Sequence, residues 1–328
     1  MTDNRIVLLQ RFSRQALDSA NLSFAPASAD ASFRRYFRAT HNQQSWIVMD
    51  APPDKENLDQ FIRIAKRLRS LGLNVPDVLA YDIDNGFCLL TDLGSIPYLD
   101  ALNAQTVERL YGDALSALVT LQRGTLTEPT FLPPYSFALL RQEMELFRQW
   151  YVTTHLRYPL SAEEDTMLTT TFDRLATNAL AQPQVWVHRD YHSRNLMVES
   201  RHNPGILDFQ DAVQGAITYD LVSLLKDCYI SWPRTLVVEW VKGYCRLSYE
   251  SGLHRCEDED QFVEWFDHMG VQRHLKVAGI FARLHYRDGK STYLNDLPLT
   301  LHYLQNATAQ YDDLAPLHAL LDRLGTHL

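Results

Sequence analysis

The chain has 328 residues and a mass of 37.8 kDa, with 46% hydrophobic and 22% charged residues. This is the composition of a folded globular protein and excludes wholesale disorder. Acidic residues outnumber basic ones by 40 to 31, which gives a formal net charge of −9. That charge argues against a protein whose main partner is nucleic acid or an anionic membrane. It does not argue against binding of a small anion, because one local cationic cluster or a bound metal can reverse the charge at the site.

The length predicts about two domains, with a core large enough to need no disulfides. The four cysteines form no C-x-x-C pair, so we expect reduced, apolar core residues and no zinc site; they are Cys88, Cys228, Cys245 and Cys256. The N-terminal residues lack a signal-peptide pattern and no apolar run approaches about 18 residues, so the expected location is the cytoplasm. Nothing in the sequence indicates an oligomeric state.

The first third of the chain predicts strands and one helix. Residues 32–40 and 46–49 have strand patterns around a polar turn, and the prolines at 52 and 53 end the second strand. Apolar residues recur at helical spacing over 56–71, and Gly72 is well placed to end that helix. Two further strands are predicted at 78–81 and 86–90.

After Gly94 the pattern becomes helical, over residues 106–122, 137–151 and 164–180. Ser161 and Glu164 have capping-box spacing at the start of the third helix. Strand-like runs follow at 185–188, 195–199 and 205–209, and helices resume from about 219. The prediction is an α+β fold of two lobes: a small antiparallel β lobe with one helix, residues 1–93, and a larger, mainly helical lobe, residues 94–328. A ligand is expected in a cleft between the lobes.

The densest polar signal lies in residues 187–198, VHRDYHSRNLMV. It places Asp190 in a loop between two apolar strands and Asn195 at the end of that loop. Thirteen residues further on, Asp208 ends another predicted strand. Phosphoryl transfer needs one carboxylate that orients the attacking hydroxyl and accepts its proton, together with oxygen ligands for Mg²⁺. We therefore expect Asp190 to be the catalytic base and Asn195 and Asp208 to be the metal ligands.

These residues resemble the kinase signature H-x-D-x-x-x-x-N followed by D-F-x. Several features are typical of the aminoglycoside phosphotransferase superfamily: His192 within HRDYHSRN, Asp208 within DFQD, the segment GAITYDL at 215–221, the segment LLTDLG at 89–94, and the lack of an A-P-E segment. The resemblance implies a protein-kinase-like two-lobed fold, with ATP and Mg²⁺ as cofactors. It also implies structural roles for His188 and Asp220, and a hinge at Asp92 and Leu93 that meets adenine.

A narrower resemblance rests on residues 29–38 (ADASFRRYFR), 47–53 (IVMDAPP) and 219–228 (YDLVSLLKDC). These are similar to the bacterial family of anomeric N-acetylmuramate/N-acetylglucosamine kinases. The resemblance implies transfer of phosphate from ATP to the C1 hydroxyl of an amino sugar, in cell-wall sugar recycling. No single residue identifies the sugar on physical grounds.

The chain departs from the kinase pattern at two places. The segment 29–32 contains no glycine, and Met49 stands where the phosphate-pairing lysine is expected. A thioether cannot pair with phosphate. We therefore expect Arg34, Arg35 or Arg38 to replace the lysine in part. The expected nucleotide contacts are Ser32, Arg34, Arg35, Arg38, Asp92 and Leu93.

An amino-sugar site needs several hydrogen-bonding groups and an aromatic surface, and a lactyl carboxylate needs a cation or amides. The predicted substrate contacts are His192, Arg194, Lys226, Asp227, Tyr229, Trp232 and Arg283. Gln272 and Arg273 lie in the same later helix as Arg283 and are further candidates.

Two other functions stay open from the sequence. One is a different small-molecule kinase of the superfamily, which acts on an aminoglycoside or a choline-like alcohol; such cationic substrates favour an acidic pocket. The other is a nucleotide-binding pseudokinase, which Met49 and the glycine-free segment favour and the intact Asp190, Asn195 and Asp208 oppose. Protein kinase activity is disfavoured because no activation segment is evident.

Overall fold

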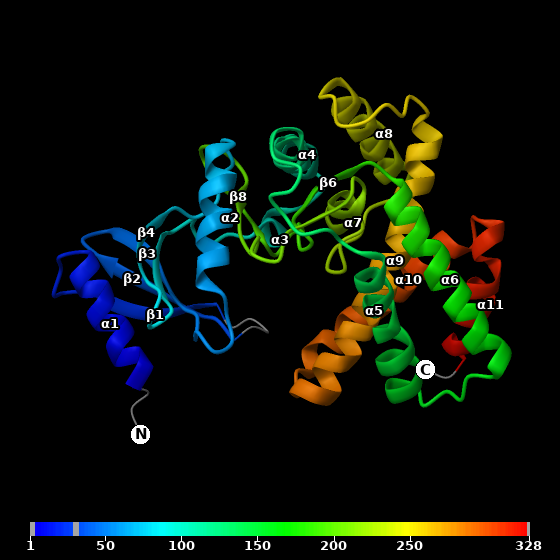
Figure 1. Ribbon diagram of the computed structural model, residues 1–328, viewed down its shortest axis with the longest axis horizontal. Coiled ribbons are helices and arrows are strands. Elements are labelled where there is room, and N and C mark those ends of the chain that lie inside the picture. The colour runs from blue at the N-terminus through cyan, green and yellow to red at the C-terminus, as the bar shows by residue number, and fades with distance from the viewer. Residues whose placement is uncertain (1–3, 29–32, 327–328) are drawn as a thin grey trace. The chain divides into compact units, whose positions relative to one another are not determined.

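The computed structural model describes residues 4–28 and 33–326, which form two compact units (Figure 1). Unit 1 consists of Met1–Ala117 and Arg194–Asp211, and unit 2 of Leu118–Ser193 and Ala212–Leu328. The division falls within helix α4 (Val107–Thr127), and a short later segment returns to unit 1. These units do not correspond to one cut after residue 93, so functional lobes at that boundary stay a prediction. No helix in the described part of the chain is long and apolar enough to cross a membrane.

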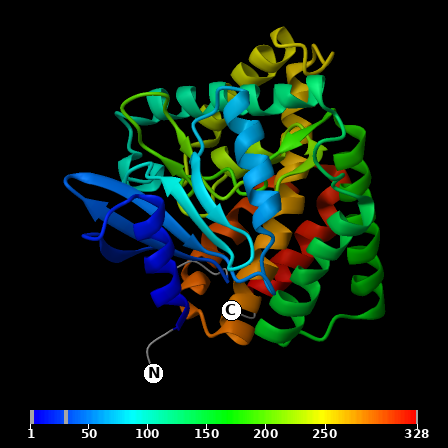
Figure 2. The same ribbon diagram turned by 60° about the vertical axis from the view of Figure 1, so that its left-hand side comes forward.

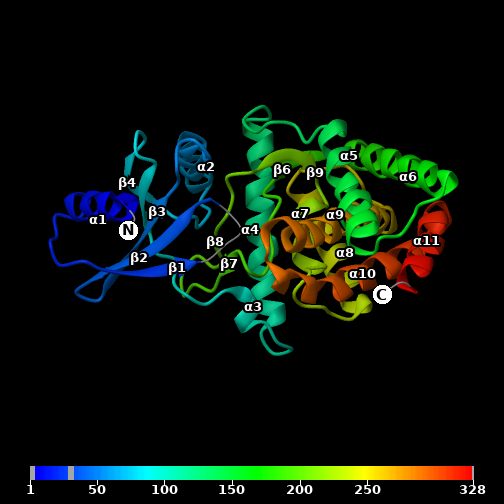
Figure 3. The ribbon, with the colours of Figure 1, turned by 90° about the horizontal axis from the view of Figure 1, so that it is seen from below.

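Unit 1 is built on an antiparallel sheet of five strands in the order β1-β2-β3-β5-β4 (Figure 3). The strands are β1 Ser23–Ser28, β2 Arg35–His41, β3 Gln44–Asp50, β4 Val78–Asp82 and β5 Phe87–Thr91. Asn42 and Gln43 close the hairpin between β2 and β3, both with positive φ. Four of the strands confirm the sequence prediction. Strand β1 and helix α1 (Asn4–Ala16) had no clear periodic signal in the sequence.

The two faces of this sheet have different partners. Leu9 of α1 packs with Ala39, Val48 and Leu89 in a core on one face. Because successive strand residues point to opposite faces, Ile47 and its neighbours two positions away belong to the other face. Helix α2 (Leu58–Ser70) runs beside β4 and β5 (Figure 2). Asn57 caps its first turn, and it ends at Leu71 and Gly72, whose φ is +89°, as predicted.

The returning segment Arg194–Asp211 is tied to unit 1 by backbone and ring contacts. Strands β7 (Leu196–Met197) and β8 (Gly205–Ile206) pair with each other, and Gly205 also bridges to Asn74. The ring of Phe209 stacks on Phe61 of α2, with centroids 5.0 Å apart. Helix α3 (Tyr98–Ala101) completes the unit.

Unit 2 is mainly helical, and the long helix α9 (Glu259–Asp288) passes through its middle (Figures 1 and 3). It contacts α5 (Phe137–Leu146), α6 (Ala162–Ala181), α7 (Tyr219–Leu225), α8 (Arg234–Glu250) and α10 (Leu297–Thr308). A two-stranded sheet of β6 (Gln184–Val187) and β9 (Val213–Ala216) precedes α7, and α11 (Ala315–Gly325) ends the chain. The predicted capping box at Ser161 is present.

The predicted helix over 137–151 divides into α5 and a π-helical segment η1 (Phe147–His155). The transition lies against Gly279 of α9, where an added Cβ would come within 2.2 Å of the Leu146 carbonyl carbon. The backbones of the two helices therefore meet at a position that only glycine fits.

We expect Gly279→Ala to destabilise the protein by about 1–3 kcal/mol, because the added methyl forces α9 away from α5. Urea unfolding followed by circular dichroism measures the change. Gly243→Ala in α8 is the matched control, since its added Cβ meets nothing closer than an Arg246 nitrogen at 4.0 Å. An unchanged midpoint for Gly279→Ala would contradict the close approach.

Candidate active site

The loop after β6 is held in place by a buried carboxylate of α7. Asp220 accepts hydrogen bonds from the backbone N–H groups of His188, at 2.6 Å, and Arg189, at 2.9 Å. Burial raises the pKa of Asp220 to about 7, although both backbone donors favour its ionised form. The His188 ring is fully buried and accepts from the Asp190 N–H at 3.3 Å. Arg189 takes a φ of +79°, a conformation that non-glycine residues rarely adopt outside functional or tightly constrained loops.

Asp190 follows in this loop and lies among positively charged groups. Burial raises its pKa, but Lys276, His192, Arg273 and Arg189 outweigh burial and hold the pKa below the usual range of an aspartate. Asp190 is therefore ionised at neutral pH. An ionised carboxylate is the form that orients a hydroxyl group and accepts its proton.

A buried charge network supports these cations. Glu143 of α5 pairs with Arg189 and with Lys276, whose Nζ lies 3.1 Å from the carboxylate, and it accepts from the Tyr135 hydroxyl. Lys276 also donates to the Tyr219 hydroxyl at 3.0 Å. Burial lowers the pKa of Lys276, but Tyr219, Glu143 and Asp190 together raise it above its ordinary value. Lys276 consequently stays charged inside the protein.

Asp190 lines a cavity of about 140 Å³ in unit 2. Three of the predicted substrate contacts line it as well: His192, Asp227 and Tyr229. Arg273 also lines it, as a candidate from the later helix, whereas Lys276 and Tyr219 had been missed. The signal for Lys276 was its spacing of one helical turn from Arg273, which by itself does not distinguish a buried cation from a solvated one. Apolar side chains of α9 form the rest of the wall: Val277, Ile280, Phe281 and Leu284.

A separate cavity of about 410 Å³ lies within unit 1. It is lined by the sheet face that α1 leaves open, including Ile47 and Leu90, and by Phe61 of α2. Most predicted nucleotide and metal residues line it: Arg38, Asp92, Leu93, Asn195 and Asp208. Arg194, predicted as a substrate contact, lines this cavity and not the one that contains Asp190.

Asn195 and Asp208 lie side by side in this cavity, with the Asn195 amide nitrogen 3.5 Å from an Asp208 oxygen. Gln210 donates to the other Asp208 oxygen at 2.7 Å, and Gln60 of α2 holds the Gln210 carbonyl at 2.9 Å. Asp208 has a φ of +62°, so its backbone is held in an unusual conformation. Amide and carboxylate oxygens are suitable Mg²⁺ ligands. In the described ranges, no cluster of three or more His, Cys, Asp or Glu side chains is arranged to hold a metal by itself.

The three arginines that follow the glycine-free segment have different carboxylate partners. Arg38 donates to Asp92 at 2.7 and 3.1 Å and to the Gly94 carbonyl at 2.7 Å, so it fixes the predicted hinge. Arg35 shares Asp50 with Arg5 of α1. Arg34 pairs at 2.6 Å with Glu56, which precedes α2.

Met49 is fully buried in β3, opposite Tyr36 and Cys88. Because its side chain is fully buried, Met49 contributes packing and no charge. If Met49 holds the position of the phosphate-pairing lysine, as predicted, that charge has to come from another residue.

The remaining predicted contacts lie elsewhere. Lys226 and Trp232 line a third cavity, of about 210 Å³, and Lys226 donates to the buried Asp267 at 2.7 Å. Arg283 lies on α9, half-buried, and does not line the cavity of Asp190. Ser32 lies outside the described residues.

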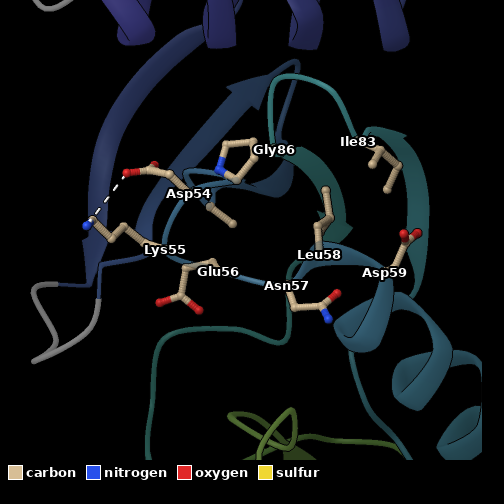
Figure 4. A pocket seen from close by; sticks show the side chains of 10 residues that line it. Asp54, Lys55, Glu56, Asn57, Leu58, Asp59, Ile83 and Gly86 are labelled. Carbon is tan, nitrogen blue, oxygen red and sulfur yellow. Dashed lines mark ion pairs between the residues drawn. The ribbon is translucent and has the colours of Figure 1, made fainter.

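Another cavity of unit 1, of about 400 Å³, is lined by Ala51, by residues 53–59 and by Ile83 and Gly86 (Figure 4). Gly86 has a φ of +71° and lies so close to the Ala51 carbonyl that no other residue fits. None of the predicted catalytic, metal or nucleotide residues lines this cavity. Figure 4 shows the carboxylate of Glu56 pointing away from Gly86 and Ile83.

Residues 23–258 match the model of the phosphotransferase enzyme family. The chain belongs to that family. Phosphate transfer is thus the reaction class of this enzyme, and the match includes both the loop of Asp190 and the pair of Asn195 and Asp208.

Curated relatives are similar over nearly the whole chain. An N-acetylmuramate/N-acetylglucosamine kinase of Pseudomonas aeruginosa is 45% identical over 299 residues, which cover 91% of this chain and 88% of that protein. A protein of the same name from Neisseria meningitidis is 45% identical over 303 residues, with 91% and 89% covered.

Solved structures of the same fold are much more distant in sequence. A choline kinase of Cryptosporidium parvum has a TM-score of 0.65 at 11% identity, with 96% of this chain and 99% of that chain covered. The ADP-bound aminoglycoside phosphotransferase APH(2'')-Ib has a TM-score of 0.57 at 14% identity, with 90% and 97% covered. These likenesses confirm the predicted two-lobed, protein-kinase-like α+β fold.

We expect Lys276→Met to move the acidic limb of the pH–rate profile to higher pH, by about one unit. Loss of the lysine charge raises the pKa of Asp190, so a larger fraction of Asp190 is protonated at low pH and inactive as a base. Initial rates of ADP release between pH 3 and 8 measure this shift. Lys242→Met removes a partly exposed lysine that pairs with Asp260 and should leave the profile unchanged; an unmoved limb in Lys276→Met would contradict the coupling.

Proposed function

We propose that this enzyme transfers the γ-phosphate of ATP to the anomeric C1 hydroxyl of N-acetylmuramate and N-acetylglucosamine. Curated relatives with that name, 45% identical over nine-tenths of the chain, support the substrate class. The charge of the Asp190 cavity supports this substrate class independently. The same charge disfavours the cationic substrates of the other kinases of the superfamily.

The cavity of Asp190 is not acidic. Its two carboxylates, Asp190 and Asp227, face two cations, Arg273 and Lys276. Asp227 is already occupied, because it accepts from the backbone N–H of Ser193 at 2.9 Å and from the Ser193 hydroxyl. A polycationic aminoglycoside or a quaternary ammonium would meet no net negative charge there. A neutral or anionic sugar suits this balance better.

The apolar wall fits an acylated amino sugar. Ile280 and Phe281 lie about one turn after Val277 on the face of α9 that lines the cavity. The 2-acetamido group is attached to the carbon next to the anomeric carbon, so its methyl must lie close to the reacting hydroxyl. Apolar side chains beside Asp190 are the surroundings that this methyl requires.

The residues then have separate roles in the transfer. Asp190 orients the C1 hydroxyl and accepts its proton as the oxygen attacks the γ-phosphorus, while the bond from phosphorus to the β–γ bridging oxygen breaks and ADP leaves. Leu93 and the sheet face of unit 1 contact the adenine. Asn195 and Asp208 would hold Mg²⁺, which neutralises phosphate charge when bound. Recycling of cell-wall sugars in the cytoplasm is the context that this reaction fits.

We expect Asp190→Ala to lower kcat by about 10²–10⁴-fold with little change in ATP binding, because the base contacts the acceptor and not the nucleotide. The protein is incubated with Mg²⁺-ATP and, in parallel, N-acetylmuramate, N-acetylglucosamine, an aminoglycoside and choline. Phosphorus NMR distinguishes an anomeric phosphate from a phosphate at another hydroxyl. Near-normal turnover in Asp190→Ala would refute its role, and a phosphate found only on the aminoglycoside or choline would refute the substrate class.

We further propose that Arg34, held by Glu56, supplies the phosphate-pairing charge that Met49 lacks. Arg34 precedes β2 by one residue and alternates with Arg35, so it belongs to the same side as Tyr36 and Arg38, which line the nucleotide cavity. Arg35 belongs to the opposite side, with Arg5 of α1. Arg38 is committed to the hinge. The ion pair of Arg34 and Glu56 thus resembles the lysine–glutamate pair that kinases use to hold the nucleotide phosphates.

We expect Arg34→Met to raise the KM for ATP about tenfold, because the phosphates lose one charged contact. Arg34→Lys should retain much of the affinity, and adding Met49→Lys to Arg34→Met should restore part of it. Arg35→Met is the matched control: it breaks the pair with Asp50 and lowers the melting temperature without changing the KM for ATP. Equal constants for wild type and Arg34→Met would remove Arg34 from the nucleotide site.

A further inference from the structure

A buried guanidinium in the cavity of Asp190 has no carboxylate partner in the protein. Arg273 of α9 is only 4% exposed and lines the cavity. Its Nη1 donates to the Cys228 thiol at 3.8 Å, a weak interaction. Among the described residues, no carboxylate oxygen forms an ion pair with Arg273 within 4.0 Å.

The other buried cations of unit 2 do have such partners. Lys276 pairs with Glu143, Arg189 pairs with Glu143, and Lys226 pairs with Asp267. A buried charge is costly unless another charge compensates it at close range, so a cation without a carboxylate requires an explanation. Burial lowers the pKa of Arg273, but Cys228, Tyr219 and Asp190 outweigh burial and raise it, so the group stays charged.

The two carboxylates whose charge acts on Arg273, Asp190 and Asp227, have other partners or roles. Asp227 accepts from Ser193 and from the Tyr229 N–H, at 3.2 Å, which fixes it to the loop. Asp190 is the proposed base. Each side-chain nitrogen of Arg273 either has a hydrogen-bond partner or is accessible to solvent. The N–H groups that Cys228 does not use are therefore open to the cavity.

We propose that Arg273 binds the carboxylate of the acceptor, the lactyl group that distinguishes N-acetylmuramate from N-acetylglucosamine. This inference rests on the proposed function and names the residue that recognises the acidic sugar. A guanidinium offers two parallel N–H donors to a carboxylate, which lysine cannot do. N-acetylglucosamine has no such group and leaves Arg273 to water, so only one of the two sugars uses this contact.

The test compares wild type, Arg273→Met and Arg273→Lys with both sugars and with the carboxamide of N-acetylmuramate. Arg273→Met should raise the KM for N-acetylmuramate by about 10–100-fold, the effect of losing a charged hydrogen bond in a buried site. The KM for N-acetylglucosamine should change less than about twofold. Arg273→Lys should fall between, because it keeps the charge but not the paired donors.

The carboxamide isolates the contact. Wild type should bind it more weakly than N-acetylmuramate, whereas Arg273→Met should bind both equally. Arg287→Met is the matched control, since Arg287 is an exposed residue of the same helix that pairs with Asp288; it should leave every constant unchanged. Melting temperatures of all variants show that they fold, and Arg273→Lys carries the comparison if Arg273→Met does not.

Three results would overturn the inference, and they differ in what else they affect. If Arg273→Met impairs both sugars equally, or lowers kcat alone, Arg273 acts on Asp190 or on the transferred phosphate. If wild type phosphorylates N-acetylglucosamine but not N-acetylmuramate, the inference fails while an amino-sugar kinase remains. If wild type phosphorylates neither sugar, the proposed function fails, and the inference fails with it.

Discussion

The candidate acceptor site depends on the burial of several charges around one carboxylate. Glu143 pairs with both Arg189 and Lys276, and these two cations hold the pKa of Asp190 low although burial would raise it. Asp220 fixes the backbone on which Asp190 stands. Each of these groups would be costly alone in the interior, and together they compensate one another. The ionised state of Asp190 is therefore a property of the whole network and not of the loop alone.

The predicted nucleotide site of unit 1 depends on the direction in which the side chains of one strand point. A small sheet has one face covered by α1 and one face open, and the alternation of side chains along β2 distributes three neighbouring arginines between them. Arg35 is used to fasten α1 through Asp50, and Arg38 is used to fix the hinge through Asp92. Arg34, which pairs with Glu56, is therefore the arginine that we propose for the phosphates. Met49, predicted at the position of the phosphate-pairing lysine, is a fully buried core residue.

The net charge of −9 and the handling of anions are compatible because charge acts locally. The excess acidic residues lie largely on the surface, where water screens them. Inside the cavity of Asp190, two cations balance two carboxylates, one of which is already bound by Ser193. We propose that a sugar with a carboxylate and a sugar without one are both acceptors. Arg273, which has no carboxylate partner among the described residues, gives a physical reason for a preference between them.

The sequence by itself determined the reaction class and most of the local structure. The spacing of Asp190, Asn195 and Asp208 indicated phosphate transfer, and periodicity placed α2, α6 and four strands, because these signals are local. Helix α1 and strand β1 were not among the predicted elements. Only the tertiary structure decided which carboxylate each arginine meets, and that Arg273 and Lys276 reach Asp190 from a helix some eighty residues later in the chain. Such pairings follow from the packing of α9 and the direction of its side chains, which no pattern of neighbouring residues encodes.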